Sequence, residues 1–213
     1  MINASEWFDV TAPIFTGMTH WPGDPSISME RVKEKQEGDM ANVSLLKMGT
    51  HTGTHMDAPL HFIQGAKDIS QIPIDFMVGR GLVITIKDPE KIRLAEIKDV
   101  GITEGMHVLF KTSNSAKDWT KKYMDDYVYM SREVANYLKE KKIKVVGVDY
   151  LSVGKEHNDK EVHLTLLGSD IWIIEGLRLQ DVPSGLYDIF CLPLKLINGD
   201  GAPARVLLKK RSA

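Results

Sequence analysis

Seven short segments rich in β-branched and apolar residues recur along this chain, and each is bounded by Gly, Pro, Asp or Asn. Short apolar runs between turn-forming residues are typical of β-strands. Their number and brevity restrict the chain to a fold that is built largely from β-sheet. The predicted strands cover residues 43–48, 82–86, 108–112, 145–148, 171–174, 189–192 and 204–208.

Helical signals are fewer. A helix is predicted over residues 131–141, because Ser131 is a suitable N-cap and an apolar stripe follows it. Shorter helices are predicted over 94–99 and 159–167. The sequence holds no internal repeat and no linker-like tract, so we expect a single α/β domain over residues 1–213, with strand-rich mixed sheets and a few helices.

Charge and composition argue against several classes of partner. Lys plus Arg total 27 and Asp plus Glu total 29, so a formal net charge of −2 gives no attraction to nucleic acid or to an anionic membrane. No apolar run approaches the ~20 residues that span a bilayer, and no secretory signal is visible. We therefore expect a cytoplasmic protein. The single cysteine, Cys191, lies in an apolar run and is predicted to be a core residue.

Four side chains that can bind metals lie within residues 51–61: His51, His55, Asp57 and His61. They include three of the seven histidines of the chain. On a helix His51 and His55 would share a face, but Asp57 would point away from both. Gly53 and Pro59 also disfavour a helix. On an extended chain, residues 51, 53, 55 and 57 all face one side, and Gly53 would leave space there for a cation.

This arrangement predicts a metal site with an open position. Two imidazoles and a carboxylate suit zinc, manganese or iron, and three protein ligands leave room for water and substrate. Pro59 ends regular strand pairing, so His61 is free to lie beside the metal as a general base. Two other interpretations stay open: a polar sheet edge that happens to contain histidines, and a structural metal site, although structural zinc sites are usually rich in cysteine.

The segment 51–61 has the form H-x-G-T-H-x-D-x-P-x-H, which resembles the signature of the cyclase-like metal-dependent hydrolases, the family of the bacterial kynurenine formamidases. Weaker likenesses to this family extend over nearly the whole chain. They comprise the turn at 21–25, the segments 147–149 and 152–153, the pair His163 and Glu175, and the segment 200–205.

The resemblance implies a site with one or two zinc ions per chain, or manganese as the alternative. One ion would be held by the first group of ligands: His51, His55 and Asp57. A second ion would be held by His163, with Asp57 and Glu175 as shared ligands. His61 would move the proton in catalysis, and Trp21 would line the substrate pocket. Taken alone, Glu175 could simply reach solvent after its strand, and His163 could be a core histidine.

The family also implies a three-layer β/β/α domain of the swivelling type, and a homodimer or homotetramer with sites near the subunit contacts. The implied activity is hydrolysis of a C–N bond in a small, aryl amide, with N-formylkynurenine as the leading candidate. An isatin- or lactam-opening hydrolase or a cyclase is the alternative within the family, and a non-catalytic metal- and ligand-binding module is the alternative outside it. The sequence leaves open whether His20, Asp24 and Asp149 take part.

Overall fold

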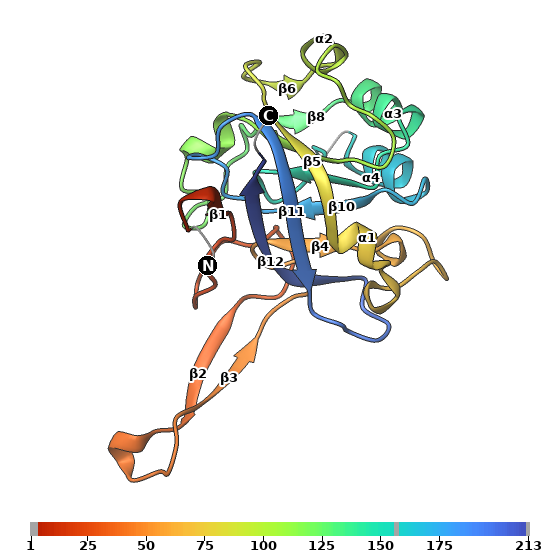
Figure 1. Ribbon diagram of the computed structural model, residues 1–213. Coiled ribbons are helices and arrows are strands. Elements are labelled where there is room, and N and C mark those ends of the chain that lie inside the picture. The colour runs from red at the N-terminus through yellow and green to blue at the C-terminus, as the bar shows by residue number, and fades with distance from the viewer. Residues whose placement is uncertain (1–3, 156–157, 212–213) are drawn as a thin grey trace.

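The strands of the computed structural model, which describes residues 4–155 and 158–211, build one eight-stranded sheet that closes on itself (Figure 1). The last strand in the order of pairing, β4, pairs with β10 on one side and with β12 on the other, and this second pairing closes the ring. In order of pairing the strands are β1 (Trp7–Asp9), β12 (Gly201–Lys210), β11 (Gly185–Pro193), β5 (Val78–Thr85), β7 (His107–Lys111), β9 (Val145–Val148), β10 (Trp172–Glu175) and β4 (His55–Asp57).

The sheet is mixed. β5, β7, β9 and β10 run parallel to one another, whereas the remaining pairings are antiparallel. The short strand β4 bridges the gap between the two kinds of pairing, because Asp57 lies opposite both Ile173 of β10 and Gly201 of β12. A closed sheet leaves no long free edge. The ring is therefore sealed by the strand that carries His55 and Asp57.

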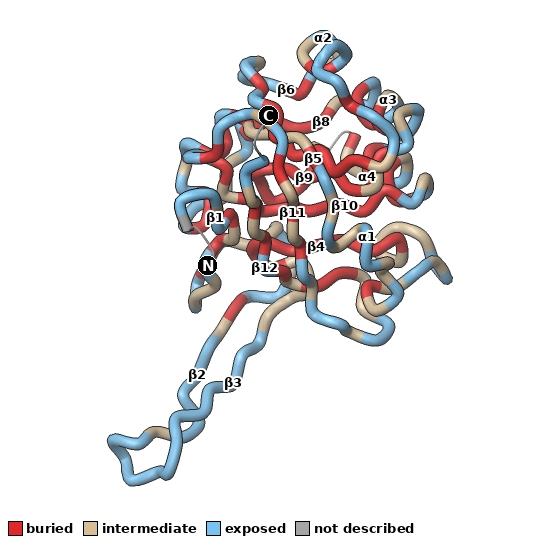
Figure 2. The backbone as a smooth tube through the Cα atoms, viewed as in Figure 1, coloured by how far each residue is buried: buried red, intermediate tan, exposed pale blue. Residues whose placement is uncertain are grey.

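Alternate residues of the parallel strands supply two separate cores. Val145, Leu109 and Trp172 point into the ring, where they pack with the inward side chains of β11 and β12. Their neighbours Val146 and Ile173 point outward and pack against the helices. Period-two alternation with both faces apolar is what a buried parallel sheet requires. Figure 2 shows the resulting buried interior of the body.

The helices α3 (Arg132–Glu140) and α4 (Asp159–Leu167) lie side by side against the outer face of the parallel strands (Figure 1). The smaller elements connect the strands. They are α1 (Ile74–Met77), α2 (Leu94–Ile97), β2 (Ser28–Lys33), β3 (Val43–Lys47), β6 (Lys91–Ile92), β8 (Tyr129–Met130) and 3-10 turns at Ala4–Glu6, Lys35–Glu37, Pro59–His61, Ile69–Gln71 and Ser113–Ala116.

The strand-rich mixed α/β prediction is confirmed. Each of the seven predicted strands overlaps an observed one, and the helix predicted after Ser131 begins there, with the Ser131 hydroxyl accepting from the Val134 N–H. The Cys191 side chain is buried, as expected. Four short strands, β1, β2, β6 and β8, were not predicted. In the described part of the chain, no helix has both the length and the apolar character needed to cross a membrane.

Candidate metal centre

The backbone of the histidine-rich segment differs from the prediction. Only His55–Asp57 is a strand; residues 51–54 form a turn, so His51 does not continue the row of β4 side chains. Gly53 has a φ of 65°, which glycine adopts without the strain of an L side chain. A Cβ at Gly53 would face Ile14 and Met18, each at 3.5 Å, and not the ligands. Gly53 therefore reverses the chain, and the proposed space for a cation beside it is wrong.

The turn is fixed against the end of β10. Thr54 Oγ1 donates to the Gly176 carbonyl (2.5 Å) and accepts from the Ala12 N–H (2.8 Å), and it is buried. Gly176 has a φ of 69°, and a Cβ there would lie 2.2 Å from the Gly53 carbonyl oxygen. Only glycine fits this approach of two backbones. The contact brings Glu175, the last residue of β10, next to the candidate ligands of the segment 51–57.

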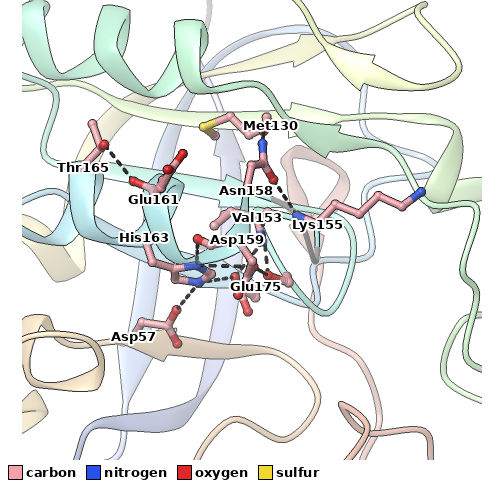
Figure 3. Close-up of polar contacts among 12 residues, drawn as sticks. Asp57, Met130, Val153, Lys155, Asn158, Asp159, Glu161, His163, Thr165 and Glu175 are labelled. Carbon is pink, nitrogen blue, oxygen red and sulfur yellow. Dashed lines mark hydrogen bonds and ion pairs between the residues drawn. The ribbon is translucent and has the colours of Figure 1, made fainter.

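The structure gathers the five side chains that the sequence suggested as ligands: His51, His55, Asp57, His163 and Glu175. His51 Nδ1 lies 2.8 Å from Asp57 Oδ1. His55 Nε2 lies 3.3 Å from Asp57 Oδ1 and 3.4 Å from Glu175 Oε2. His163 projects from α4 toward the same carboxylates (Figure 3), with Nε2 3.4 Å from Glu175 Oε1 and 3.7 Å from Asp57 Oδ2. Residues more than a hundred positions apart thus share one site.

Backbone carbonyls fix the tautomers of two of these histidines. His55 Nδ1 donates to the Gly53 carbonyl at 2.9 Å, and His163 Nδ1 donates to the Asp159 carbonyl at 2.9 Å. In a neutral imidazole the other nitrogen, Nε2, then carries a lone pair. Both Nε2 atoms face carboxylate oxygens, so the neutral imidazoles are repelled unless a metal cation lies between them; without a metal, a proton on Nε2 takes that place. Such outer hydrogen bonds are the usual way in which proteins orient metal-binding histidines.

Three further observations fit a bound metal cation. Two ligand atoms that are each about 2.1 Å from a tetrahedral cation lie about 3.4 Å apart, which matches the separations of His55 and His163 from Glu175. Asp57 Oδ2 and His51 Nε2 are buried and have no hydrogen-bond partner among the described residues. The described ion pairs of Asp57 and Glu175 all go to histidines, and none goes to Lys or Arg. Two buried carboxylates without such a cation are unfavourable.

The electrostatics of the cluster reflect this concentration of acids. Burial alone would lower the pKa of His55, but Asp57 and Glu175 reverse this effect and raise it to about 10. Burial opposes the charged form of His163 in the same way, and Glu175 with its neighbouring acids raises the pKa of His163 to about 9. The surrounding imidazoles hold the pKa of Asp57 well below its ordinary value in spite of its burial. The site attracts positive charge.

His61 and Trp21 line a cavity of about 450 Å³ above these ligands. The His61 ring stacks on His51, with centroids 3.9 Å apart, and its side chain is 29% exposed, whereas the His55 side chain is 1% exposed. Trp21 meets Tyr123 edge-on at 5.9 Å. The predicted roles of His61 and Trp21 are compatible with these positions. Of the residues left open, Asp24 lines the cavity, whereas His20 does not and donates to the Trp21 carbonyl.

Asp149 lies elsewhere and holds the chain after β7. Its buried carboxylate accepts from the N–H and hydroxyl groups of both Thr112 and Ser115. Burial raises its pKa, although these four donors oppose the shift. Asp149 is therefore a structural anchor. His157 lies outside the described residues.

Sequence reasoning missed three residues that border the site. Asp159, where the helix predicted over 159–167 begins, is the first residue of α4; it accepts from His163 through its carbonyl and from Ser152 Oγ through its carboxylate. Asp200 Oδ2 lies 3.2 Å from His51 Nε2 and 3.8 Å from His61 Nδ1. Phe62 stacks on His163, with centroids 4.4 Å apart. Phe62 directly follows His61, and Asp200 begins the family-like segment 200–205, but no role at the site was predicted for either residue.

Comparison with known proteins shows the family of the chain. Residues 8–155 match the model of a family described as "Putative cyclase". The chain belongs to this cyclase family. Two curated relatives are named kynurenine formamidase. The one from Bacillus thuringiensis subsp. konkukian (strain 97-27) is 34% identical to this chain, and the one from Bacillus anthracis is 33% identical. Each alignment covers 98% of this chain and 99% of the relative.

Solved structures of cyclase-family proteins have the same fold. A potential metal-dependent hydrolase with cyclase activity superimposes with a TM-score of 0.85 and 37% identity, covering 97% of this chain and 98% of that chain. Isatin hydrolase A from Labrenzia aggregata superimposes with a TM-score of 0.84 over 95% of this chain and 92% of its own. At 22% identity this second likeness shows the fold alone. The family and its relatives place the chain among the metal-dependent hydrolases.

Proposed function

We propose that this protein hydrolyses the C–N bond of a small aryl amide, with N-formylkynurenine as the leading substrate candidate. The observation that carries the proposal is the convergence of two imidazole Nε2 atoms, of His55 and His163, on two buried carboxylates, those of Asp57 and Glu175, at 3.3–3.7 Å. A divalent cation would satisfy all four groups. The names of the curated relatives support the choice of substrate.

The site residues would divide the work between holding the metal and moving a proton. His51, His55 and Asp57 would hold one cation, and His163 with Glu175 would complete the site or hold a second. When bound, such a cation polarises a carbonyl oxygen and lowers the pKa of water to about 7. His61 lies on the cavity side of these ligands and is more exposed than they are. It would take a proton from the attacking water and deliver it to the departing nitrogen.

The cavity favours a small, flat substrate. Its volume of about 450 Å³ is in the range of small-molecule sites. Trp21, Phe62 and His61 place three rings on its wall, which suits an aryl group that stacks or packs edge-on. Asp24 and Asp200 add polar groups at the wall.

The finer predictions of the sequence remain part of this proposal. They are zinc or manganese as the native metal, one or two ions per chain, the β/β/α layering of a swivelling-type single domain over residues 1–213, a cytoplasmic location and a homodimer or homotetramer. Elemental analysis of protein purified without added metal would give the identity and stoichiometry of the ion. A protein that binds no divalent metal under metal-replete conditions would contradict the proposed function.

Turnover measurements would test the roles of the residues. Purified protein assayed side by side on N-formylkynurenine and on isatin is expected to prefer the first, and absence of activity on it would exclude the formamidase assignment. His61→Asn is expected to lower kcat by about 10²–10⁴-fold, because general acid–base catalysis contributes this much, while metal content is unchanged. The matched control is His20→Asn, since His20 lies outside the cavity lining. A His61→Asn variant with the rate of the original protein would contradict the proton-transfer role.

A further inference from the structure

Asp200 is an acid of the site to which the proposed reaction gives no role. In the described part of the chain it supplies the one ion pair of His61, with Asp200 Oδ2 3.8 Å from His61 Nδ1. The same oxygen lies 3.2 Å from His51 Nε2. The two imidazole rings stack with their centroids 3.9 Å apart. One carboxylate oxygen therefore faces the edges of two stacked histidines, of which one is a candidate metal ligand and the other is the proposed proton carrier.

Backbone hydrogen bonds hold Asp200 and His61 near each other. The Ala58 N–H donates to the Asp200 carbonyl at 2.9 Å, and the His61 N–H donates to the Ala58 carbonyl, also at 2.9 Å. Ala58 is fully buried, and buried backbone groups are rarely left without such bonds. The chain itself therefore keeps Asp200 close to His61.

Thr50 orients the Asp200 carboxylate. Thr50 Oγ1 donates to Asp200 Oδ1 at 2.9 Å, and Oδ2 is the oxygen that faces the two histidines. Gly201 leaves room for this arrangement, because a Cβ there would lie 2.7 Å from His51 Cε1. The Asp200 side chain is 46% exposed, so water offsets part of the cost of keeping its negative charge beside the cavity. The carboxylate is thus held by a bond that involves neither histidine.

Proton transfer by His61 requires one particular tautomer. A neutral imidazole carries its proton on Nδ1 or on Nε2, and only the other nitrogen can act as a base. An ionised carboxylate accepts hydrogen bonds and donates none, so Asp200 Oδ2 favours a proton on His61 Nδ1 and repels a lone pair there. Catalytic bases are commonly oriented by a third group in this way. Such bonds are often long without substrate and shorten in the complex, so the separation of 3.8 Å is compatible with this role.

We propose that Asp200 is a positioning residue for His61. Its carboxylate accepts the Nδ1 proton of His61, which leaves the Nε2 lone pair to take a proton from the attacking water. When His61 becomes an imidazolium, the negative charge of Asp200 stabilises it. Thr50 supports this role by holding the other carboxylate oxygen. The consequence for turnover rests on the proposed function, whereas the tautomer of His61 is a property of the chain itself.

Long-range ¹H–¹⁵N correlation spectra of protein labelled with ¹⁵N-histidine would report the tautomer directly. Spectra are recorded at pH 8 after incubation with zinc, and the His61 signals are those missing from His61→Asn. His61 is expected to carry its proton on Nδ1. Asp200→Ala should lower the ratio of the Nδ1–H form to the Nε2–H form by at least about tenfold, because a hydrogen bond to a charged acceptor maintains such a ratio. The matched control Asp24→Ala, which removes another carboxylate of the cavity, should leave the ratio unchanged. A proton on Nε2 in the original protein, or the same ratio in Asp200→Ala, would overturn the proposal.

Turnover of N-formylkynurenine separates the positioning role from two others. Asp200→Ala is expected to lower kcat by about 10–100-fold, the usual cost of losing an outer hydrogen-bond partner of a histidine at a metal site, with KM and metal content unchanged. Thr50→Val should lower kcat less, and the double variant should be no slower than Asp200→Ala alone, because both changes disturb one interaction. A raised KM with unchanged kcat would make Asp200 a substrate contact, and loss of an ion would make it a metal ligand; either result would overturn the proposal. The spectra need no turnover, so failure of the proposed function is distinguishable from failure of this inference.

Discussion

His107 gives the protein a pH-dependent stability that can be worked out from its surroundings. The side chain is fully buried at the start of β7, where Nε2 donates to the Asp75 carbonyl at 3.2 Å and Nδ1 has no hydrogen-bond partner among the described residues. Gly79 lies against the ring, and a Cβ there would be 2.5 Å from Nε2. Burial lowers the pKa of His107 to about 4; Lys144 adds to this shift, and Asp75 opposes it.

The sign of the effect follows from which state binds the proton. Between pH 6.5 and pH 4 the unfolded chain protonates this histidine and the folded chain does not, so acid favours unfolding. With a folded pKa of about 4 and an unfolded pKa of about 6.5, His107 lowers the free energy of unfolding by about 1.4 kcal/mol at pH 5.5 and about 2.5 kcal/mol at pH 4.5, relative to pH 8.

Urea unfolding of the original protein and of His107→Leu at pH 8, 5.5 and 4.5 would measure this contribution. The other histidines titrate in both proteins, so the difference between the two pH profiles isolates His107. The stability of the original protein should fall more steeply toward acid, by the amounts above, and His107→Leu should lack that part of the slope. Parallel profiles would refute the reasoning, because they would mean that His107 protonates without cost in the folded state.

Two further substitutions test how the site is supported. Gly176→Ala should lower the free energy of unfolding, measured in urea, by at least about 3 kcal/mol and weaken metal binding, because the new Cβ would lie 2.2 Å from the Gly53 carbonyl oxygen. The control Gly65→Ala, at a φ of 76° and with open space around the new Cβ, should cost only about 1 kcal/mol. Equal losses in the two variants would contradict the steric argument. Asp149→Asn should lower the free energy of unfolding by about 3 kcal/mol, because an amide cannot accept from all four donors. The control Asp126→Asn, at an exposed position, should change it by less than about 0.5 kcal/mol. A similar loss in both variants would refute the anchoring role of Asp149.

The sequence predicted the elements of the core better than the shape of the site. The strand 145–148 was placed correctly because its residues are apolar on both faces and are bounded by charged and turn residues. The strands β6 and β8 are two residues long and exist through their pairing with each other, which no local pattern reveals. Charged residues in β2 likewise concealed its pairing with β3.

The segment 51–61 illustrates the difference between composition and geometry. Its residue types indicated a metal site because carboxylate and imidazole at such density are rarely needed otherwise. The extended backbone was wrong because Gly53 was interpreted through its missing side chain, whereas the structure uses its positive φ. Asp200 and Asp159 were missed because tertiary folding brings them to the site, Asp200 from the bend just before β12 and Asp159 from the start of α4.

Closing the sheet and assembling the site are the same structural event. β4 pairs with β10 and β12, and this pairing sets Asp57 between the end of β10, which carries Glu175, and the start of β12, which follows Asp200. Three carboxylates meet at this seam, and like charges in a buried site repel one another. A cation held there would therefore join the two halves of the ring as well as activate a substrate, since metal binding to a site that exists only in the folded chain contributes directly to folding. The three-residue strand β4 seals the ring through its backbone pairing, and a bound cation would reinforce this seam because the side chains of β4 would supply ligands in addition to the hydrogen bonds.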